Sequence, residues 1–119
     1  MKKKAALILI FVCIITLSAC FRTEKVTDIA SFDSPDGGFV LIFQQSGEPE
    51  WPFGKTDVRL TLKDKTGKTL NETDSEVQND GANAGEGNVK SVEWRNDSVV
   101  VILQASEMPD KTVELRYNK

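Results

Sequence analysis

The residues of this sequence best suited to covalent chemistry are its two cysteines, Cys13 and Cys20. Near neutral pH a thiol is the stronger nucleophile, because its thiolate is far more reactive than a serine hydroxyl. Cys20 directly follows Ser18 and Ala19, two small residues that let an extended backbone fit a narrow protease cleft. Cys13 lies within an apolar run and is interpreted as an apolar filler. Cys20 is therefore the candidate for covalent modification.

The N-terminal segment has the layout of a secretion signal. Three lysines at residues 2–4 precede an apolar run at residues 5–15, and small residues come before Cys20. The run is too short to span a bilayer, which requires about 20 apolar residues, but it suits a cleaved signal helix. We expect residues 1–19 to be a signal peptide that is removed between Ala19 and Cys20. The alternatives are ordinary cleavage after Ala19 and a retained membrane segment.

The segment Leu17-Ser18-Ala19-Cys20 resembles the lipobox of bacterial lipoproteins. The resemblance covers residues 1–20 and implies that the Cys20 thiol receives a diacylglyceryl group before a dedicated peptidase cuts. A single acyl chain holds a protein only marginally, whereas two chains give stable anchoring. The implied location is the extracytoplasmic face of the cell membrane, with the membrane as a partner through Cys20.

The composition of the remaining chain limits its chemistry. The sequence has no histidine, and lipidation would consume its last thiol, so Ser-His-Asp sites, Cys-His sites and histidine or thiolate metal sites are excluded. Removing the three signal lysines from 15 basic residues leaves 12 against 18 acidic ones, a net charge of −6. This balance argues against nucleic-acid binding, which needs Lys and Arg to neutralise phosphates. We expect no cofactor and no enzymatic activity.

Short alternating segments separated by turn residues predict an all-β fold after a tether at residues 20–25. We expect residues 26–119 to form one small antiparallel β-sandwich or barrel of about seven strands. The expected strands are 26–32, 39–45, 57–64, 68–77, 88–95, 98–104 and, after a Met108-Pro109-Asp110 turn, one that carries Val113, Leu115 and Tyr117. Strands that are neighbours in the chain should be neighbours in the sheet.

Residues 47–54 form the first loop with functional potential. Two prolines and two glycines restrict its backbone, and the bond from Trp51 to the next proline is a candidate cis bond. A rigid loop that presents Trp51 and Phe53, with Glu48 and Glu50 beside them, suits contact with a protein or carbohydrate. The alternative is that both rings fold back and cap an open end of the sandwich.

Residues 78–88 form a second, glycine-rich loop. Asp80 and Glu86, with nearby amide oxygens, offer the oxygen ligands that Ca²⁺ prefers. The spacing departs from the calcium loop D-x-[DN]-x-[DN]-G-x5-E, because Gly81 and Ala82 occupy ligand positions. A solvated connecting loop is the better interpretation, so Asp80 and Glu86 are only weak metal candidates.

Two carboxylate pairs complete the candidate chemistry. Glu48 and Glu50 lie two residues apart, as do Asp74 and Glu76, so each pair can share one face of an extended segment. A glycosidase needs two carboxyls across a cleft, one of them with a raised pKa. The sequence offers no apolar pocket that would raise it, which favours solvated surface charge.

The three segments Gly-Glu-Pro-Glu-Trp-Pro-Phe-Gly, Asn-Asp-Gly and Ser-Pro-Asp-Gly resemble parts of small lipoproteins and secreted domains of Gram-positive bacteria whose activities are not established. Our leading hypothesis is a lipid-anchored, non-enzymatic module that binds a protein or an envelope component. One alternative is a small carboxylate-based hydrolase or a calcium-dependent module that uses Asp80 and Glu86. Another is an immunity or self-protection lipoprotein.

Overall fold

The computed structural model describes residues 25–118. The expected signal peptide at residues 1–19, its cleavage site at Ala19 and the lipidation site at Cys20 lie outside the described residues, as does most of the tether at residues 20–25. Within residues 25–118, no helix is long and apolar enough to cross a membrane.

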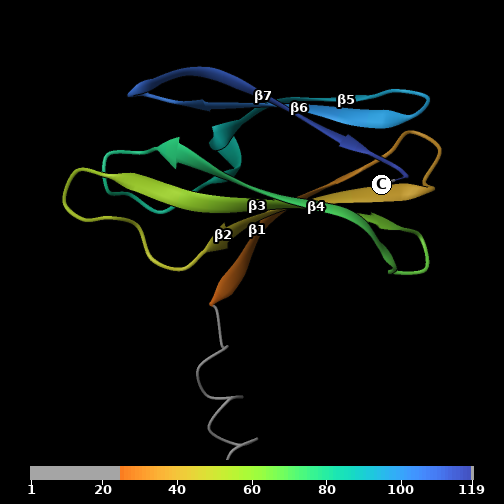
Figure 1. The fold of residues 1–119 in the computed structure, drawn as a ribbon, viewed down its shortest axis with the longest axis horizontal. Coiled ribbons are helices and arrows are strands. Elements are labelled where there is room, and N and C mark those ends of the chain that lie inside the picture. The colour runs from red at the N-terminus through yellow and green to blue at the C-terminus, as the bar shows by residue number, and fades with distance from the viewer. Residues whose placement is uncertain (1–24, 119) are drawn as a thin grey trace, which may run out of the picture.

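The described chain forms seven antiparallel strands in two sheets that pack face to face as a small β-sandwich (Figure 1). The strands are β1 (Val26–Asp33), β2 (Phe39–Ser46), β3 (Lys55–Asp64), β4 (Thr69–Gln78), β5 (Val89–Trp94), β6 (Ser98–Ala105) and β7 (Met108–Arg116). One sheet has the order β1-β2-β3-β4 and the other β5-β6-β7, joined by a loop that contains the 3-10 helix η1 (Glu86–Asn88). The predicted all-β sandwich is confirmed, and the barrel alternative is wrong.

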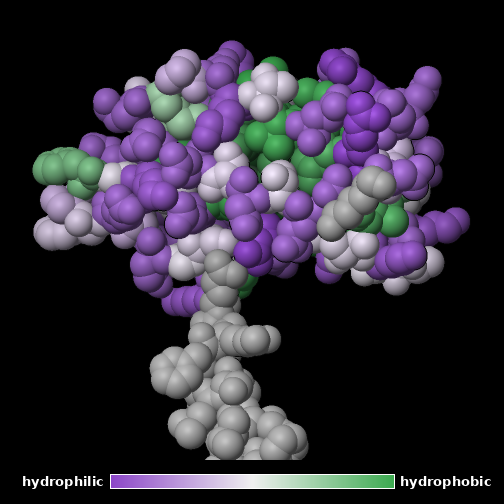
Figure 2. Space-filling view, in the orientation of Figure 1, coloured by the Kyte–Doolittle hydropathy of each residue, from purple (hydrophilic) through white to green (hydrophobic). Residues whose placement is uncertain are grey.

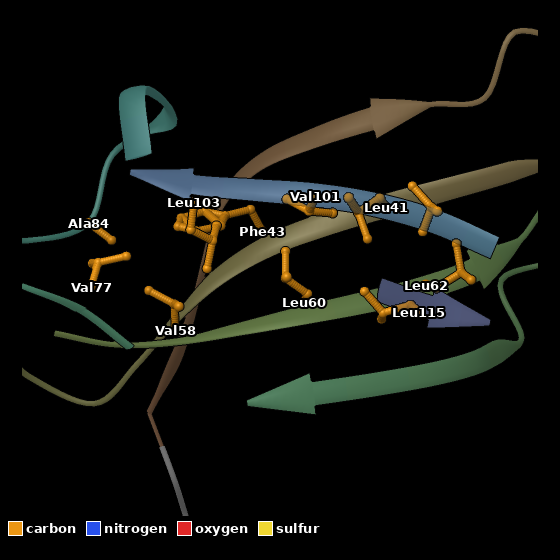
Figure 3. Close-up of a cluster of buried hydrophobic side chains, with 11 residues drawn as sticks. Leu41, Phe43, Val58, Leu60, Leu62, Val77, Ala84, Val101, Leu103 and Leu115 are labelled. Carbon is orange, nitrogen blue, oxygen red and sulfur yellow. The ribbon is translucent and has the colours of Figure 1, made fainter. Parts of the chain in front are cut away.

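The core lies between the two sheets and follows the predicted alternation along the strands. Val58, Leu60 and Leu62 of β3 are fully buried, whereas Arg59 and Lys63 between and beyond them remain partly exposed. The buried cluster comprises Leu41, Phe43, Val58, Leu60, Leu62, Val77, Ala84, Val99, Val101, Leu103 and Leu115 (Figure 3). Most of these side chains come from β2, β3 and β6, because each of these strands has a paired neighbour on both sides.

The sandwich has two distinct ends. The β1–β2, β3–β4 and β5–β6 turns lie at one end, on the right in Figure 1, which we call the far end. The β2–β3 and β4–β5 loops and the β6–β7 turn lie at the other end, which we call the entry end because the chain enters β1 there. The N-terminal segment is therefore attached to the same end as the two long loops.

Aspartates hold two of the three turns at the far end, the β1–β2 turn and the β3–β4 turn. The Asp64 carboxylate accepts hydrogen bonds from the Thr66 hydroxyl and from the backbone N–H of Lys68 (3.1 Å). The Asp36 carboxylate accepts one from the backbone N–H of Gly38 (2.9 Å). The hydrogen bond from the Thr66 hydroxyl is the main cause that lowers the pKa of Asp64 below its usual value. The hydrogen bond from the Gly38 N–H is the main cause that lowers the pKa of Asp36.

The predicted turn at Met108-Pro109-Asp110 is wrong. Strand β7 already begins at Met108, which pairs with Ala105, so the turn consists of residues 106–107. Pro109 is tolerated inside β7 because this is an edge strand, where one missing N–H donor need not break a ladder on both sides. Proline was a misleading turn signal at this position.

Candidate functional site

The β2–β3 loop, residues 47–54, presents two aromatic rings to solvent, and we call it the aromatic loop. Trp51 is 84 % exposed and Phe53 is 80 % exposed, and no other large hydrophobic side chain among residues 25–118 is classed as exposed. A small hydrophobic projection at the left edge of Figure 2 lies over this loop. The interpretation in which both rings fold back as a cap is therefore wrong. The predicted cis bond between Trp51 and Pro52 is present.

Short backbone contacts hold the aromatic loop in place. The N–H of Glu50 donates to the carbonyl of Lys55 (3.0 Å), which closes the tip of the loop. The N–H of Gly81 donates to the carbonyl of Gly54 (3.0 Å), which attaches the tip to the β4–β5 loop. Gly81 has a φ of +78°, and an added Cβ would overlap the Pro52 carbonyl. The two loops therefore pack backbone against backbone, and the rings stand on a fixed support.

The β4–β5 loop is more than a solvated connection, because β2 and β3 bind it down. The Gln45 side chain accepts a hydrogen bond from the N–H of Ala84 (2.7 Å) and donates one to the carbonyl of Gly47 (3.0 Å). The Thr56 hydroxyl donates to the carbonyl of Ala82 (2.7 Å). Ala84 is 7 % exposed and lies beside Val77 at one end of the core (Figure 3). Gln45 thus links both loops of the entry end.

Glu48 connects the aromatic loop to the point where the chain enters the domain. Its carboxylate forms an ion pair with the ammonium of Lys25 (3.2 Å), and the N–H of Gly47 donates to the Lys25 carbonyl (2.7 Å). Residue 25 therefore lies directly beside the first residue of the aromatic loop. The Glu50 side chain is exposed on the same loop.

Asp80 and Glu86, the weak calcium candidates, are both exposed on the β4–β5 loop. Asp80 occupies the left-handed region with a φ of 55°, as an Asn-Asp-Gly turn allows. Within residues 25–118, no three His, Cys, Asp or Glu side chains converge in a way that could hold a metal ion. The structure does not bring Asp80 and Glu86 into a ligand cluster.

The second carboxylate pair lies in a ladder of ion pairs on β3 and β4. Asp74 pairs with the guanidinium of Arg59 (2.8 Å), and Glu76 pairs with the ammonium of Lys55 (2.9 Å). The hydrogen bond from Lys55 lowers the pKa of Glu76. A catalytic acid would need the opposite shift, toward a raised pKa. Asp74 and Glu76 therefore fit cross-strand pairing between β3 and β4.

Sequence reasoning missed an aromatic stack at the far end. The ring of Phe39 lies over the ring of Tyr117, with centroids 4.3 Å apart and an interplanar angle of 14°, and beside the ring of Trp94, 6.5 Å away. The Tyr117 hydroxyl donates to the Arg95 carbonyl (2.6 Å), and burial raises the pKa of this hydroxyl. A shallow cavity of about 290 Å³ borders the stack. Phe39 lies on β2, Trp94 on β5 and Tyr117 just after the end of β7, so no local sequence pattern predicts their contact.

Comparison with known proteins gives no assignment. The chain matches no protein-family model, and it has no significant similarity to a curated protein or to a solved structure. The function is therefore inferred from the geometry of the described residues and from the sequence before them.

Proposed function

We propose that this chain is the precursor of a membrane lipoprotein, held on the extracytoplasmic face of the cell membrane by a diacylglyceryl group on Cys20. The β-domain acts as a non-enzymatic binding module for a protein or another component of the cell envelope. Its contact surface is the aromatic loop, with Trp51 and Phe53 as the anchoring side chains.

The observation that carries this proposal is the exposure of two large rings on a fixed backbone. Ordering a flexible side chain at an interface costs about 0.5–1.5 kcal/mol, and Trp and Phe have few torsions to restrict. The hydrogen bonds from Glu50 and Gly81 already order the loop in the free domain. Burying either ring would remove a large apolar area from water, which is the usual source of binding energy at aromatic hot spots.

The anchor is tested by the substitution Cys20→Ser in the full-length chain. When the chain is expressed in a bacterial host fed an alkyne-labelled fatty acid, wild type is expected to carry the label and Cys20→Ser to lose it completely, since a serine hydroxyl does not replace the thiolate. The measurement is in-gel detection of the label after click coupling. Cys13→Ser is the matched control and should keep full labelling. Label on Cys20→Ser, or none on wild type, would refute the anchor.

The contact surface is tested by the paired substitution Trp51→Ala/Phe53→Ala. Crosslinking on intact cells should join wild type to an envelope component, and the paired variant should lose that product. The control Ser106→Ala/Glu107→Ala changes two exposed side chains in the β6–β7 turn at the same end and should retain the product. A paired variant that stays folded and yields every wild-type product would remove the aromatic loop from the proposal.

A further inference from the structure

The N-terminal segment meets the domain beside the aromatic loop. At the start of β1, Val26 pairs with Ser46, the last residue of β2. Gly47 follows Ser46 and donates its N–H to the Lys25 carbonyl (2.7 Å). The ion pair between Lys25 and Glu48 adds a side-chain contact at the same place. The attachment point of the tether and the base of the loop are therefore neighbours.

Chain length then limits how far the loop can lie from the bilayer. Five residues take the chain from Cys20 to Lys25, a span of at most about 18 Å when fully extended. Four residues take it from Gly47 to Trp51, at most about 14 Å. The headgroup layer of one leaflet is itself about 5–8 Å thick. A domain anchored through Cys20 thus keeps Trp51 within reach of the membrane–water interface.

The two ends of the sandwich treat their aromatic residues differently. At the far end the rings of Phe39, Trp94 and Tyr117 stack on one another and pack against the core. At the entry end Trp51 and Phe53 have no stacking partner among the described rings and are 84 % and 80 % exposed. The two large hydrophobic side chains that the described domain leaves exposed therefore lie at the end where the described chain begins.

We infer that the partner of the aromatic loop is the lipid bilayer itself, whose interface accepts Trp51 and Phe53 as a second contact beside the lipidated Cys20. Aromatic rings concentrate at membrane–water interfaces, where the indole N–H meets the headgroups and the ring body meets the acyl chains. This inference rests on the proposed lipid anchor.

With the lipid anchor in place, the contact of two aromatic side chains is sufficient to hold the loop at the bilayer. Tethering makes the insertion of the rings an intramolecular event. A short linker gives the rings an effective concentration of about 1 mM at the bilayer. Electrostatic attraction to anionic lipid is not expected to contribute to this contact. The chain after residue 19 has 12 basic and 18 acidic residues, a net charge of −6, and Lys25 is paired with Glu48. Insertion is therefore expected into zwitterionic membranes, and only for the tethered domain.

The two tryptophans provide the test, because one lies at each end of the sandwich. The full-length chain is purified from a bacterial host with its lipid and reconstituted into phosphatidylcholine vesicles that contain brominated phosphatidylcholine, which quenches tryptophan fluorescence on contact. In Trp94→Phe, where Trp51 is the sole tryptophan, most of the emission is expected to be lost. In Trp51→Phe, where Trp94 remains, the emission should be unchanged.

The comparison remains decisive if Trp94→Phe fails to fold. Subtracting the emission of Trp51→Phe from the emission of wild type then gives the emission of Trp51. Bromine near the headgroups should quench Trp51 more than bromine at the chain ends. A protein with acylated Cys20 whose Trp51 emission is unaffected by brominated lipid would overturn the bilayer inference. Crosslinking of Trp51 to a protein on intact cells would then identify a protein as the partner.

Failure of the anchor gives a different result from failure of the inference. The mass of the N-terminal peptide reports whether Cys20 carries the diacylglyceryl group. If it does not, the lipoprotein proposal fails, and the Cys20 thiol of Cys13→Ser is coupled to a maleimide lipid in the same vesicles. Quenching of Trp51 in this coupled protein supports the orientation that the fold imposes, and its absence refutes it.

Discussion

Replacing Phe43 with alanine is expected to lower the free energy of unfolding by about 3–5 kcal/mol, the usual loss for removing a buried aromatic ring. Phe43 is fully buried and is the largest of the fully buried side chains. It lies on β2, between β1 and β3, and faces the second sheet across the core (Figure 3). A domain of this size has about 5–15 kcal/mol of stability in total, so the variant should be close to unfolding. Urea titration followed by circular dichroism measures the change.

The matched control is the same substitution at Phe53, the phenylalanine of the β2–β3 loop. Its side chain is 80 % exposed, so Phe53→Ala should change the free energy of unfolding by no more than about 0.5 kcal/mol. Under the proposed membrane contact, the same variant should bind the bilayer more weakly. A loss of stability below about 1 kcal/mol in Phe43→Ala would contradict the packing of the core, because the cavity term alone would exceed it.

These two phenylalanines show what the sequence could and could not predict. Phe43 belongs to an apolar run rich in β-formers, and its burial follows from that pattern. Phe53 lies between turn residues, where a projecting ring and a ring folded back as a cap are equally compatible with the sequence. The outcome depends on a contact between distant segments, because the β4–β5 loop buries Ala84 at the entry end and its Gly81 N–H holds the aromatic loop at the Gly54 carbonyl.

Most of the strands and the pairing within each hairpin were predictable because the signals are local. Val58, Leu60 and Leu62 alternate with polar residues, and the Asp64 turn is read from four consecutive residues. The division into sheets of four and three strands was not predictable, since it depends on where the chain crosses over. The side-chain contact from Gln45 to Ala84 likewise joins residues that are 39 positions apart.

The position of Lys25, where the described chain begins, relative to the aromatic loop is a non-local property of the same kind. The sequence places Cys20 and Trp51 in separate segments and gives no reason to connect them. The connection appears only when β1 pairs antiparallel with β2, because this pairing returns the chain to Lys25 at Gly47. An odd number of strand passages would have placed the loop at the far end, away from Lys25. The hairpin topology therefore decides which end of the domain would meet the bilayer under the proposed lipid anchor.

Replacing Gly81 with alanine is expected to destabilise the domain by about 2–4 kcal/mol and to displace the aromatic loop. The residue has a φ of +78°, where an L side chain is strained, and the new Cβ would overlap the Pro52 carbonyl and lie 2.7 Å from its carbon. Strain in the left-handed region and crowding against a backbone each cost about 1–3 kcal/mol. Urea titration gives the stability, and brominated vesicles report whether Trp51 still reaches the bilayer.

Gly67→Ala separates the two causes. Gly67 has a φ of +90°, but nothing lies within 4 Å of the position of an added Cβ. It should therefore show only the conformational penalty, about 1–2 kcal/mol, with unchanged quenching of Trp51. The difference in the free energy of unfolding between Gly81→Ala and Gly67→Ala measures how much the contact between the β4–β5 loop and the aromatic loop contributes to stability. Equal stability losses with equal quenching would mean that this contact does not position Trp51, and the rings would then lack the fixed support on which the proposed membrane contact depends.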